Sequence, residues 1–165
     1  MKYFFTGSLK HFLMLAICSV GITVVRAEIL RPPAVPLVTF DPYLSIWSEA
    51  DKLTDKNTQH WTHREHSLAS LIRIDGRTYR LMGAEPKDAP AFKQVSLQVL
   101  PTRSIYEFED AGVHVTLTFM TAALPHDLDI FSRPLSYLTW AVRSADGATH
   151  ESAIWSPQTG LQSAG

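Results

Sequence analysis

The sequence predicts an all-β protein, an antiparallel β-sandwich that is incomplete at its C-terminal end. Apolar and polar residues alternate with a period of two in several segments. The turn-forming pairs Asp75-Gly76 and Asp146-Gly147 follow such segments, and no long segment has helical periodicity. About seven short strands joined by tight turns are typical of a sandwich.

The clearest element is a β-hairpin over residues 101–121. Tyr106 and Phe108 are alternate residues of its first strand, and a second alternating strand begins at Val113. A four-residue loop over residues 109–112 would pair Phe108 with Val113 and keep the apolar side chains on one face. A three-residue loop would mix the two faces, so we reject it.

Further strands are expected on both sides of this hairpin. They are Val38–Trp47, interrupted at Asp41-Pro42, then Ser70–Ile74 and Arg77–Met82 around an Asp75-Gly76 turn, Val95–Val99 and Leu135–Arg143. The Asp-Gly pair predicts a type I′ turn, which pairs Ile72 with Tyr79 and Ser70 with Leu81.

The segments between the strands have their own signatures. Residues 30–37 contain three prolines and predict an extended lead-in or edge segment. Residues 83–92 are a Pro/Ala-rich connector, and residues 121–134 form a loop with room for one helical turn. A further strand is due near His150, but residues 151–165 lose the alternation, so we expect none there.

The N-terminus predicts a secretory signal peptide. Lys2 and Lys10 precede the apolar run Phe12–Val25, and cleavage is expected after Ala27. Cys18, the only cysteine, would leave with the signal, so the mature chain would have neither a disulfide nor a thiol. We expect a secreted or periplasmic protein without a stable membrane anchor; an uncleaved anchor is the alternative.

The composition limits the classes of partner and reaction. The formal net charge is −1 and no basic face stands out, which argues against a nucleic-acid partner. The chain has no nucleophile elbow, Gly-rich phosphate loop or nucleotide fingerprint. The sequence therefore predicts no cofactor and assigns no catalytic residue.

The polar segment Ser48–Ser67 is the best candidate for a binding site. It has the character of a long ordered loop, and such loops are often functional. We name Trp61, His63 and His66 as candidate binding residues, with ligand stacking on Trp61 as the mechanism. A tryptophan that fixes the loop to the sheet is the alternative. The histidines, with His60, could suggest zinc, but no helix supports that spacing, and surface or structural histidines are preferred.

Two other sets of residues have simple alternatives to function. Asp127 and Asp129 could act as paired carboxylates, although solvated or helix-capping residues are the better interpretation. Trp140 lies on the apolar face of its predicted strand and is assigned to the core.

Three long segments resemble a known family. Residues 30–48 (LRPPAVPLVTFDPYLSIWS), residues 52–82 with HWT and IRIDGRTYR, and residues 101–147 with PTRSIYEFEDAGV and DLDIFSRPLSYLTW resemble the N-terminal region of the glutaminase A family. The resemblance implies a secreted multi-domain hydrolase that converts L-glutamine to L-glutamate and ammonia. It also implies an N-terminal β-sandwich followed by a helical catalytic domain, which would be the missing partner of this chain.

The resemblance leads to four segments and two functional hypotheses. The segments are a signal peptide (1–27), a family N-terminal module (28–92), the start of a second β-sandwich module (93–150) and an atypical tail (151–165). In the first hypothesis the chain is a non-catalytic N-terminal fragment of the parent enzyme, produced by truncation or a frameshift. In the second it is a stand-alone secreted module that binds a ligand or glycan.

Overall fold

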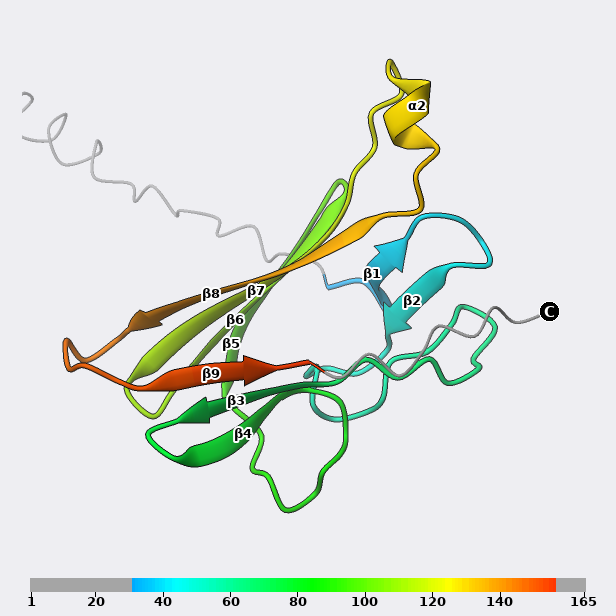
Figure 1. Cartoon of the computed structure of the whole chain (residues 1–165). Helices are drawn as coiled ribbons and strands as arrows, with labels where there is room; N and C mark the ends of the chain where they lie inside the picture. Colours follow the sequence, from blue (N-terminus) through cyan, green and yellow to red (C-terminus); the bar gives the residue numbers. More distant parts are fainter. Residues whose placement is uncertain (1–30, 157–165) are drawn as a thin grey trace, which may run out of the picture.

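A computed structural model describes residues 31–156, and the predicted signal peptide lies outside this range. The described chain forms β1 (Val35–Thr39), β2 (Ser45–Ser48), β3 (Ser70–Ile74), β4 (Arg77–Met82), β5 (Gln94–Leu100), β6 (Arg103–Asp110), β7 (Val113–Thr121), α2 (Leu128–Phe131), β8 (Ser136–Ser144) and β9 (Ser152–Trp155). These elements are almost all strands, as the sequence predicts (Figure 1).

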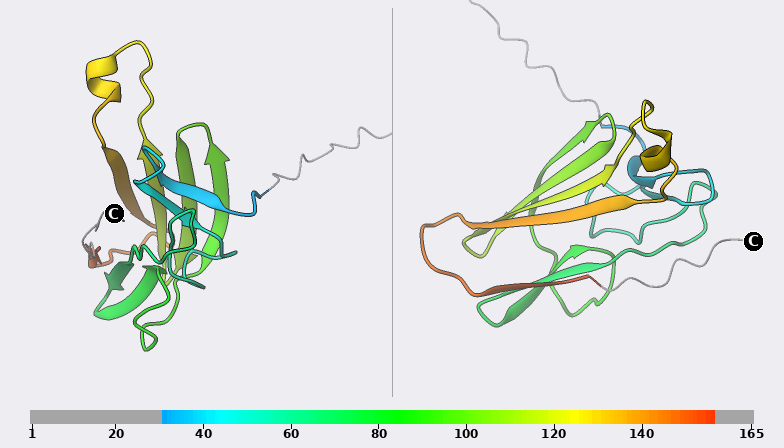
Figure 2. Two further views of the ribbon diagram at one scale, coloured as in Figure 1. Left: turned by 90° about the vertical axis from the view of Figure 1, so that its right-hand side faces the viewer. Right: turned by 45° about the horizontal axis from the view of Figure 1, so that its top comes forward.

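The strands form three antiparallel sheets. The largest has the order β5-β6-β7-β8, a second has the order β4-β3-β9, and β1 pairs with β2. The four-stranded and three-stranded sheets face each other, with β1 and β2 beside one end of the space between them (Figure 2). This arrangement confirms the all-β, sandwich-like fold.

The apolar core lies between the sheets and draws on the whole described chain. Its buried members are Val35, Leu37, Leu53, Ile72, Ile74, Tyr79, Leu81, Met82, Phe92, Tyr106, Phe108, Val113, Val115, Leu117 and Phe119. The alternation in β6 and β7 explains the second half of this set, because every second residue of a strand faces the same side. Residues on both sides of the 83–92 connector therefore share one core.

The hairpin between β6 and β7 has a shorter loop than the sequence suggested. Phe108 pairs with Val115 and Asp110 with Val113, so the predicted four-residue loop is wrong. Ala111 and Gly112 form a two-residue turn with φ values of 47° and 74°, as a type I′ turn requires. The predicted pairing is shifted by two residues, and such a shift leaves every side chain on its predicted face. Alternation alone could not distinguish the two registers.

The hairpin between β3 and β4 follows the prediction except at its open end. Asp75 and Gly76 both have positive φ, and Ile72 pairs with Tyr79, as predicted. Ser70 pairs with Met82 and not with Leu81, because the register shifts between Ser70 and Leu71.

Two other segments differ from the expectation. Val38–Trp47 is not one interrupted strand but contains parts of two strands, β1 and β2, which pair with each other. The expectation that no strand follows His150 is also wrong, because β9 pairs with β3 and places Ile154 opposite Ile72. β9 has only four residues, the shortest length at which alternation can be recognised, and its sequence SAIW does not alternate.

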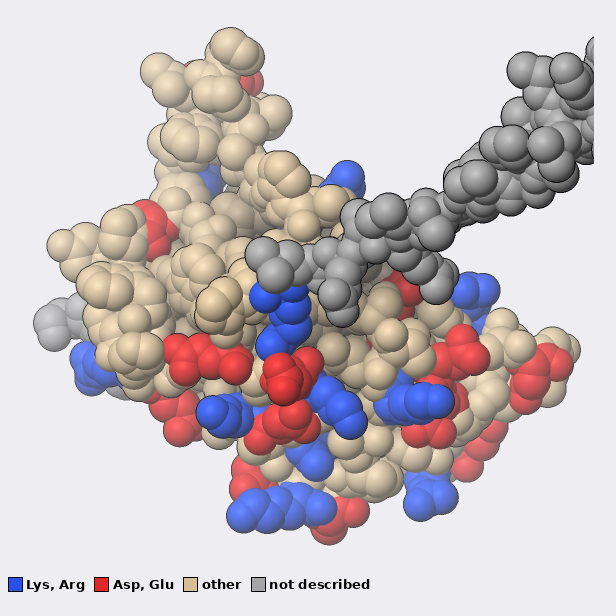
Figure 3. Space-filling view, turned by 180° about the vertical axis from the view of Figure 1, so that it is seen from behind, with Lys and Arg blue, Asp and Glu red and all other residues tan. Residues whose placement is uncertain are grey.

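The β7–β8 arm, residues 122–135, projects beyond the sheets and includes α2, which matches the predicted helical turn (Figure 1). None of the α2 residues is buried. The large exposed apolar side chains of the arm are Leu124, Leu128, Ile130, Phe131 and Leu135. Seen from behind, the arm is largely uncharged, whereas charged side chains gather over the lower part of the molecule (Figure 3).

Candidate functional site

The segment between β2 and β3 is an ordered loop, as the sequence predicts. Residues Gln59 and Glu65 form an isolated antiparallel bridge, and Gln59 also pairs with Trp47 of β2. The Thr58 hydroxyl donates to the His66 carbonyl at 2.5 Å and accepts from the Leu68 amide at 2.8 Å. Backbone and side-chain hydrogen bonds therefore fix the path of this loop.

His60 is a buried structural residue of this loop. Its Nε2 lies 2.8 Å from the Pro42 carbonyl oxygen, which can only accept, so Nε2 carries the proton. Its Nδ1 accepts from the Thr62 amide at 3.3 Å and lies 2.8 Å from the Thr62 hydroxyl. Thus Nδ1 is engaged within the loop, and Nε2 ties the loop to the β1–β2 connection.

Trp61 lies next to His60 and remains 57% exposed. Its Nε1 donates to the same Pro42 carbonyl at 2.7 Å, and its ring centroid lies 5.4 Å from that of His60. The indole is therefore held at its edge by the β1–β2 connection while part of its surface faces solvent. The contacts of Trp61 are compatible with both predicted roles. Its hydrogen bond fixes the loop, and its exposed surface is available for stacking.

The two candidate histidines have different surroundings. His63 has a positive φ of 64°, and its Nδ1 lies 3.0 Å from Glu49 Oε1. The His66 ring lies 5.6 Å from the His60 ring, and the buried His66 Nδ1 has no hydrogen-bond partner within residues 31–156. The structure thus brings His66 to the His60–Trp61 pair, whereas His63 pairs with Glu49.

Over residues 31–156, no three His, Asp or Glu side chains are placed to hold a metal ion. The preferred interpretation of the histidines as structural or surface residues agrees with the contacts of His60 and His63.

Asp127 and Asp129, the possible carboxylate pair, lie at the N-terminus of α2. Asp127 is the N-cap of α2, and its Oδ1 accepts from the Ile130 amide at 3.0 Å. Asp129 lies in the first helical turn and is exposed. The capping interpretation is therefore confirmed for Asp127.

Trp140 packs against the core, although it is only partly buried. Its Nε1 donates to the Ser70 hydroxyl at 3.2 Å and so links the two larger sheets.

The strongest cluster of titratable side chains lies at the other end of the sandwich. His150 Nδ1 lies 2.6 Å from Asp75 Oδ2, and His150 Nε2 lies 3.1 Å from Asp146 Oδ1. Asp75 sits in the β3–β4 turn, and the other two residues lie between β8 and β9. We call these three residues the His150 clamp, since one imidazole joins two separate connections of the fold.

The two carboxylates determine the electrostatics of the clamp. The hydrogen bond to Asp75, followed by that to Asp146, raises the pKa of His150 above its ordinary value. The bond to His150 lowers the pKa of Asp75. The Ala148 amide, then His150, lowers the pKa of Asp146 to about 2. These effects favour a protonated imidazole between two carboxylates.

The His150 clamp does not have the geometry of a catalytic triad. A general base needs one ring nitrogen directed at a nucleophile. Here each nitrogen faces a carboxylate, and the nearby Ser144 hydroxyl donates to Asp146 Oδ1 at 3.1 Å. The arrangement can hold charge and position the connections, but it leaves no imidazole nitrogen to activate a hydroxyl.

Sequence reasoning missed this cluster. Asp75 and Asp146 were each recognised only as part of an Asp-Gly turn, and His150 belonged to no motif. The pairing of β3 with β9 brings them together, and that pairing had no signal in the sequence.

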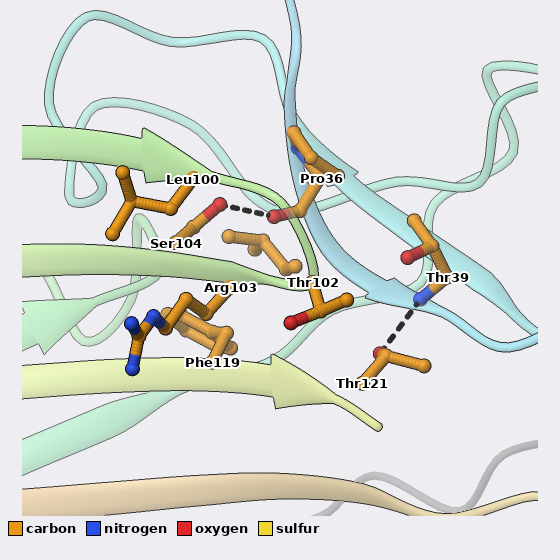
Figure 4. Close-up of a pocket in the computed structure, with 9 residues that line it drawn as sticks. Pro36, Thr39, Leu100, Thr102, Arg103, Ser104, Phe119 and Thr121 are labelled. Atoms are coloured by element: carbon orange, nitrogen blue, oxygen red, sulfur yellow. Dashed lines mark hydrogen bonds between the residues drawn. The ribbon is translucent and has the colours of Figure 1, made fainter. Parts of the chain in front are cut away.

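A small hollow lies between β1 and the ends of β5, β6 and β7. Its volume is about 40 Å³, and its lining includes Leu37, Arg103 and Phe119. Two hydrogen bonds cross it, from the Ser104 hydroxyl to the Pro36 carbonyl and from the Thr39 amide to the Thr121 hydroxyl (Figure 4). Ligand pockets are usually about 300–1,000 Å³, so this hollow is too small for an organic substrate.

The fold defines a β-sandwich module, and comparisons with known proteins place it in a family. The chain belongs to the family described as "Domain of unknown function (DUF4964)", which matches residues 15–97. A second description, "Domain of unknown function (DUF5127)", matches residues 102–160.

A curated relative connects this module with a named protein. The chain is 32% identical over 133 residues to the Aspergillus oryzae protein called Glutaminase A. The match covers 76% of this chain and 19% of the relative, so the chain spans about a fifth of the relative's length. The comparisons support the resemblance to the N-terminal region of that family.

Two further results complete the comparison. No solved structure matches the chain. In the part of the chain that the structure describes, no helix is both long and apolar enough to cross a membrane.

Proposed function

We propose that this chain is the non-catalytic N-terminal β-sandwich of a secreted glutaminase-like hydrolase. The parent protein would convert L-glutamine to L-glutamate and ammonia, and its C-terminal helical domain would carry the catalytic residues. The match to the Aspergillus oryzae Glutaminase A, which covers only 19% of that protein, is the observation on which this proposal rests.

The side-chain geometry supports a non-catalytic role for the sandwich. The imidazole nitrogens of His60 are engaged by Pro42 and Thr62, and those of His150 by Asp75 and Asp146. Neither histidine is arranged as the base of a nucleophile–base pair. The role of the module would be to support a catalytic domain by packing against it.

The test compares the isolated chain with a chimera. The purified chain should release no ammonia from L-glutamine above a buffer control. In the Aspergillus oryzae protein, replacing the matched segment by the corresponding residues of this chain should preserve more soluble enzyme and ammonia release than deleting it. Ammonia release by the chain alone, or a chimera no better than the deletion, would overturn the proposal.

A second candidate function is ligand binding by the β2–β3 loop. The observation that favours it is the exposed indole of Trp61, held in place by its hydrogen bond to Pro42. Such a surface could stack on a glycan ring, with the His60 ring next to it and His66 packed against His60. Calorimetric titration with soluble oligosaccharides should then give a heat of binding that Trp61→Ala removes and His126→Ala, a change on the β7–β8 arm, preserves.

A further inference from the structure

The four-stranded sheet ends in β8, which is a long and regular edge strand. All nine β8 residues pair with β7 without a shift in register. Arg143 is its only charged residue, and it contains no proline. Natural sheet proteins usually protect such edges with lysine, proline, a bulge or a covering segment. By these criteria, and within residues 31–156, the edge of β8 that faces away from β7 has none of these protections.

The opposite side of the sandwich shows the usual protection. The connector after β4 covers the outer edge of β4. There the Arg80 backbone amide donates to the Pro90 carbonyl, and the Arg80 carbonyl accepts from the Phe92 amide, both at 2.8 Å. The outer strand β5 has an irregular register between Gln94 and Ser96. Among the outer strands of the two larger described sheets, β8 thus combines length, regularity and low charge. Figure 2 shows its place at the edge of the four-stranded sheet.

The hydrogen-bonding direction of β8 follows from its last contact with β7. The Ala145 amide donates to the Gly112 carbonyl at 2.8 Å, toward the β6–β7 turn. Backbone groups alternate along a strand, so the odd-numbered residues of β8 bond to β7 and the even-numbered ones face the free edge. Leu138, Trp140 and Val142 therefore carry backbone donors and acceptors that β7 leaves unpaired.

The β8 sequence is complementary to itself in one antiparallel register. With a two-fold axis at Trp140, Leu138 faces Val142 of the partner, Thr139 faces Ala141, and Tyr137 faces Arg143. Leu138 and Val142 are both apolar and meet on the core side of the sheet. On the outer side the small residues Thr139 and Ala141 meet, and the Arg143 cation lies beside the Tyr137 ring. Arg143 never faces Arg143 of the other copy.

We propose that β8 is a homodimer interface, through which two copies of this chain join their four-stranded sheets edge to edge in the Trp140-centred register. A two-fold axis makes the contact closed and self-limiting. The partner strand also covers the margin of the core, where Val142 is 38% exposed. The proposal is independent of the glutaminase-like function, because it depends only on the edge of β8.

A charge-exchange experiment tests both the edge and the register. Thr139 and Ala141 face the outer side of β8, and Ala141 is exposed. In the T139K/A141K variant, the lysine introduced at position 139 faces the lysine introduced at position 141 of the other copy, twice per dimer. In the T139K/A141E variant, each lysine faces a glutamate at the same two places. The two variants change the same edge and differ only in the sign of one charge.

Size-exclusion chromatography with light scattering and sedimentation equilibrium measures the outcome. The wild-type chain should be dimeric, and T139K/A141K should dissociate at least about tenfold more readily than T139K/A141E. Thr116→Lys, which places a lysine on the same face of the central strand β7, should leave the dimer intact. Far-UV circular dichroism and thermal melts confirm that each variant is folded.

Three results would overturn the proposal. A monomeric wild-type chain would assign the β8 edge to a different partner, such as a strand from another part of the parent protein. Equal dissociation of the two double variants would exclude this register. A dimer lost on Thr116→Lys but not on T139K/A141K would place the contact on the sheet face.

Discussion

His150 Nδ1 lies 2.6 Å from Asp75 Oδ2, although 75 residues separate them in the sequence. The Glu151 amide also donates to Asp75 Oδ1 at 2.9 Å, and the Asp75 amide donates to the Glu151 carbonyl at 3.0 Å. The β3–β4 turn and the two residues just before β9 are therefore joined by three contacts around Asp75.

This relationship predicts how stability depends on pH. The pKa of His150 is raised above 6.5 in the folded chain, so its contribution is fully present below that pH and is lost as the pH rises through the folded pKa. Asp75 and Asp146, whose pKa values are lowered, contribute above pH 3.8, and the part due to Asp146 is lost as the pH falls toward about 2. The clamp stabilises the fold most between these limits.

Thermal melts of the wild type and His150→Gln test this prediction. As the pH rises from about 6 through the raised pKa of His150, the melting temperature of the wild type should fall further than that of the variant. The two curves should converge at the alkaline end. His126→Gln on the β7–β8 arm is the control and should follow the wild type. Parallel curves for wild type and His150→Gln would contradict the clamp.

Gly112 should be intolerant of a side chain for two reasons. Its φ is +74°, and an added Cβ would lie 2.8 Å from His150 Nε2 and closer still to Asp146. Gly76 has a similar φ of +84° but no atom within 4 Å of the added carbon. Backbone strain of this kind costs about 1–3 kcal/mol, so Gly76→Ala should lose that amount and Gly112→Ala more. If urea denaturation gave equal losses of unfolding free energy for the two variants, Asp146 and His150 would have moved away from the added methyl group without destabilising the fold.

The sequence predicted the hairpins better than the contacts between them. Asp75-Gly76 specified its own turn, because positive φ at two successive residues favours Asp-Gly and the signal is local. The predicted β6–β7 register was wrong by two residues. Ala111-Gly112 is a weaker turn signal than Asp-Gly, and each side chain lies on the same face of the sheet in both registers.

The sequence predicted those parts of the candidate site that lie within one short segment of the chain, but not the contacts between distant segments. The ordered loop around Trp61 has a recognisable composition, and its exposed tryptophan was identified as a candidate. The partner of Trp61, the Pro42 carbonyl, is a backbone atom and leaves no pattern in the sequence. The His150 clamp depends on the pairing of β3 with the four-residue β9, which sequence periodicity cannot reveal.

The predicted signal peptide gives a direct test of export. If Lys2, Lys10 and the run Phe12–Val25 direct secretion, the exported chain should begin at Glu28. Intact-mass measurement of protein recovered outside the cytoplasm checks this start. Recovery of the chain from Met1 in the membrane fraction would favour the uncleaved anchor.

Trp61 should contribute to the order of the β2–β3 loop. Trp61→Ala removes the indole donor to Pro42 and the ring next to His60. Because the loss of one hydrogen bond costs about 0.5–1.5 kcal/mol, we expect a modest loss of stability with faster hydrogen exchange confined to the loop. His63→Ala, which removes an exposed contact to Glu49, is the matched control and should change little. Equal protection in all three proteins would leave only the ligand-binding role for Trp61.

The position of the core predicts that truncating a side chain costs much more stability in β7 than in the neighbouring strand β8. Leu117 in β7 is fully buried, whereas Val142 in β8 is 38% exposed. Leu117→Ala removes buried methyl groups and leaves a cavity, so it should cost about 2–5 kcal/mol. Val142→Ala removes groups that already contact water, so we expect a cost of about 1 kcal/mol or less. Urea denaturation in the T139K/A141K background measures both without a contribution from pairing of β8. Similar losses for the two variants would mean that the core extends to β8 and that this side of the sandwich is closed.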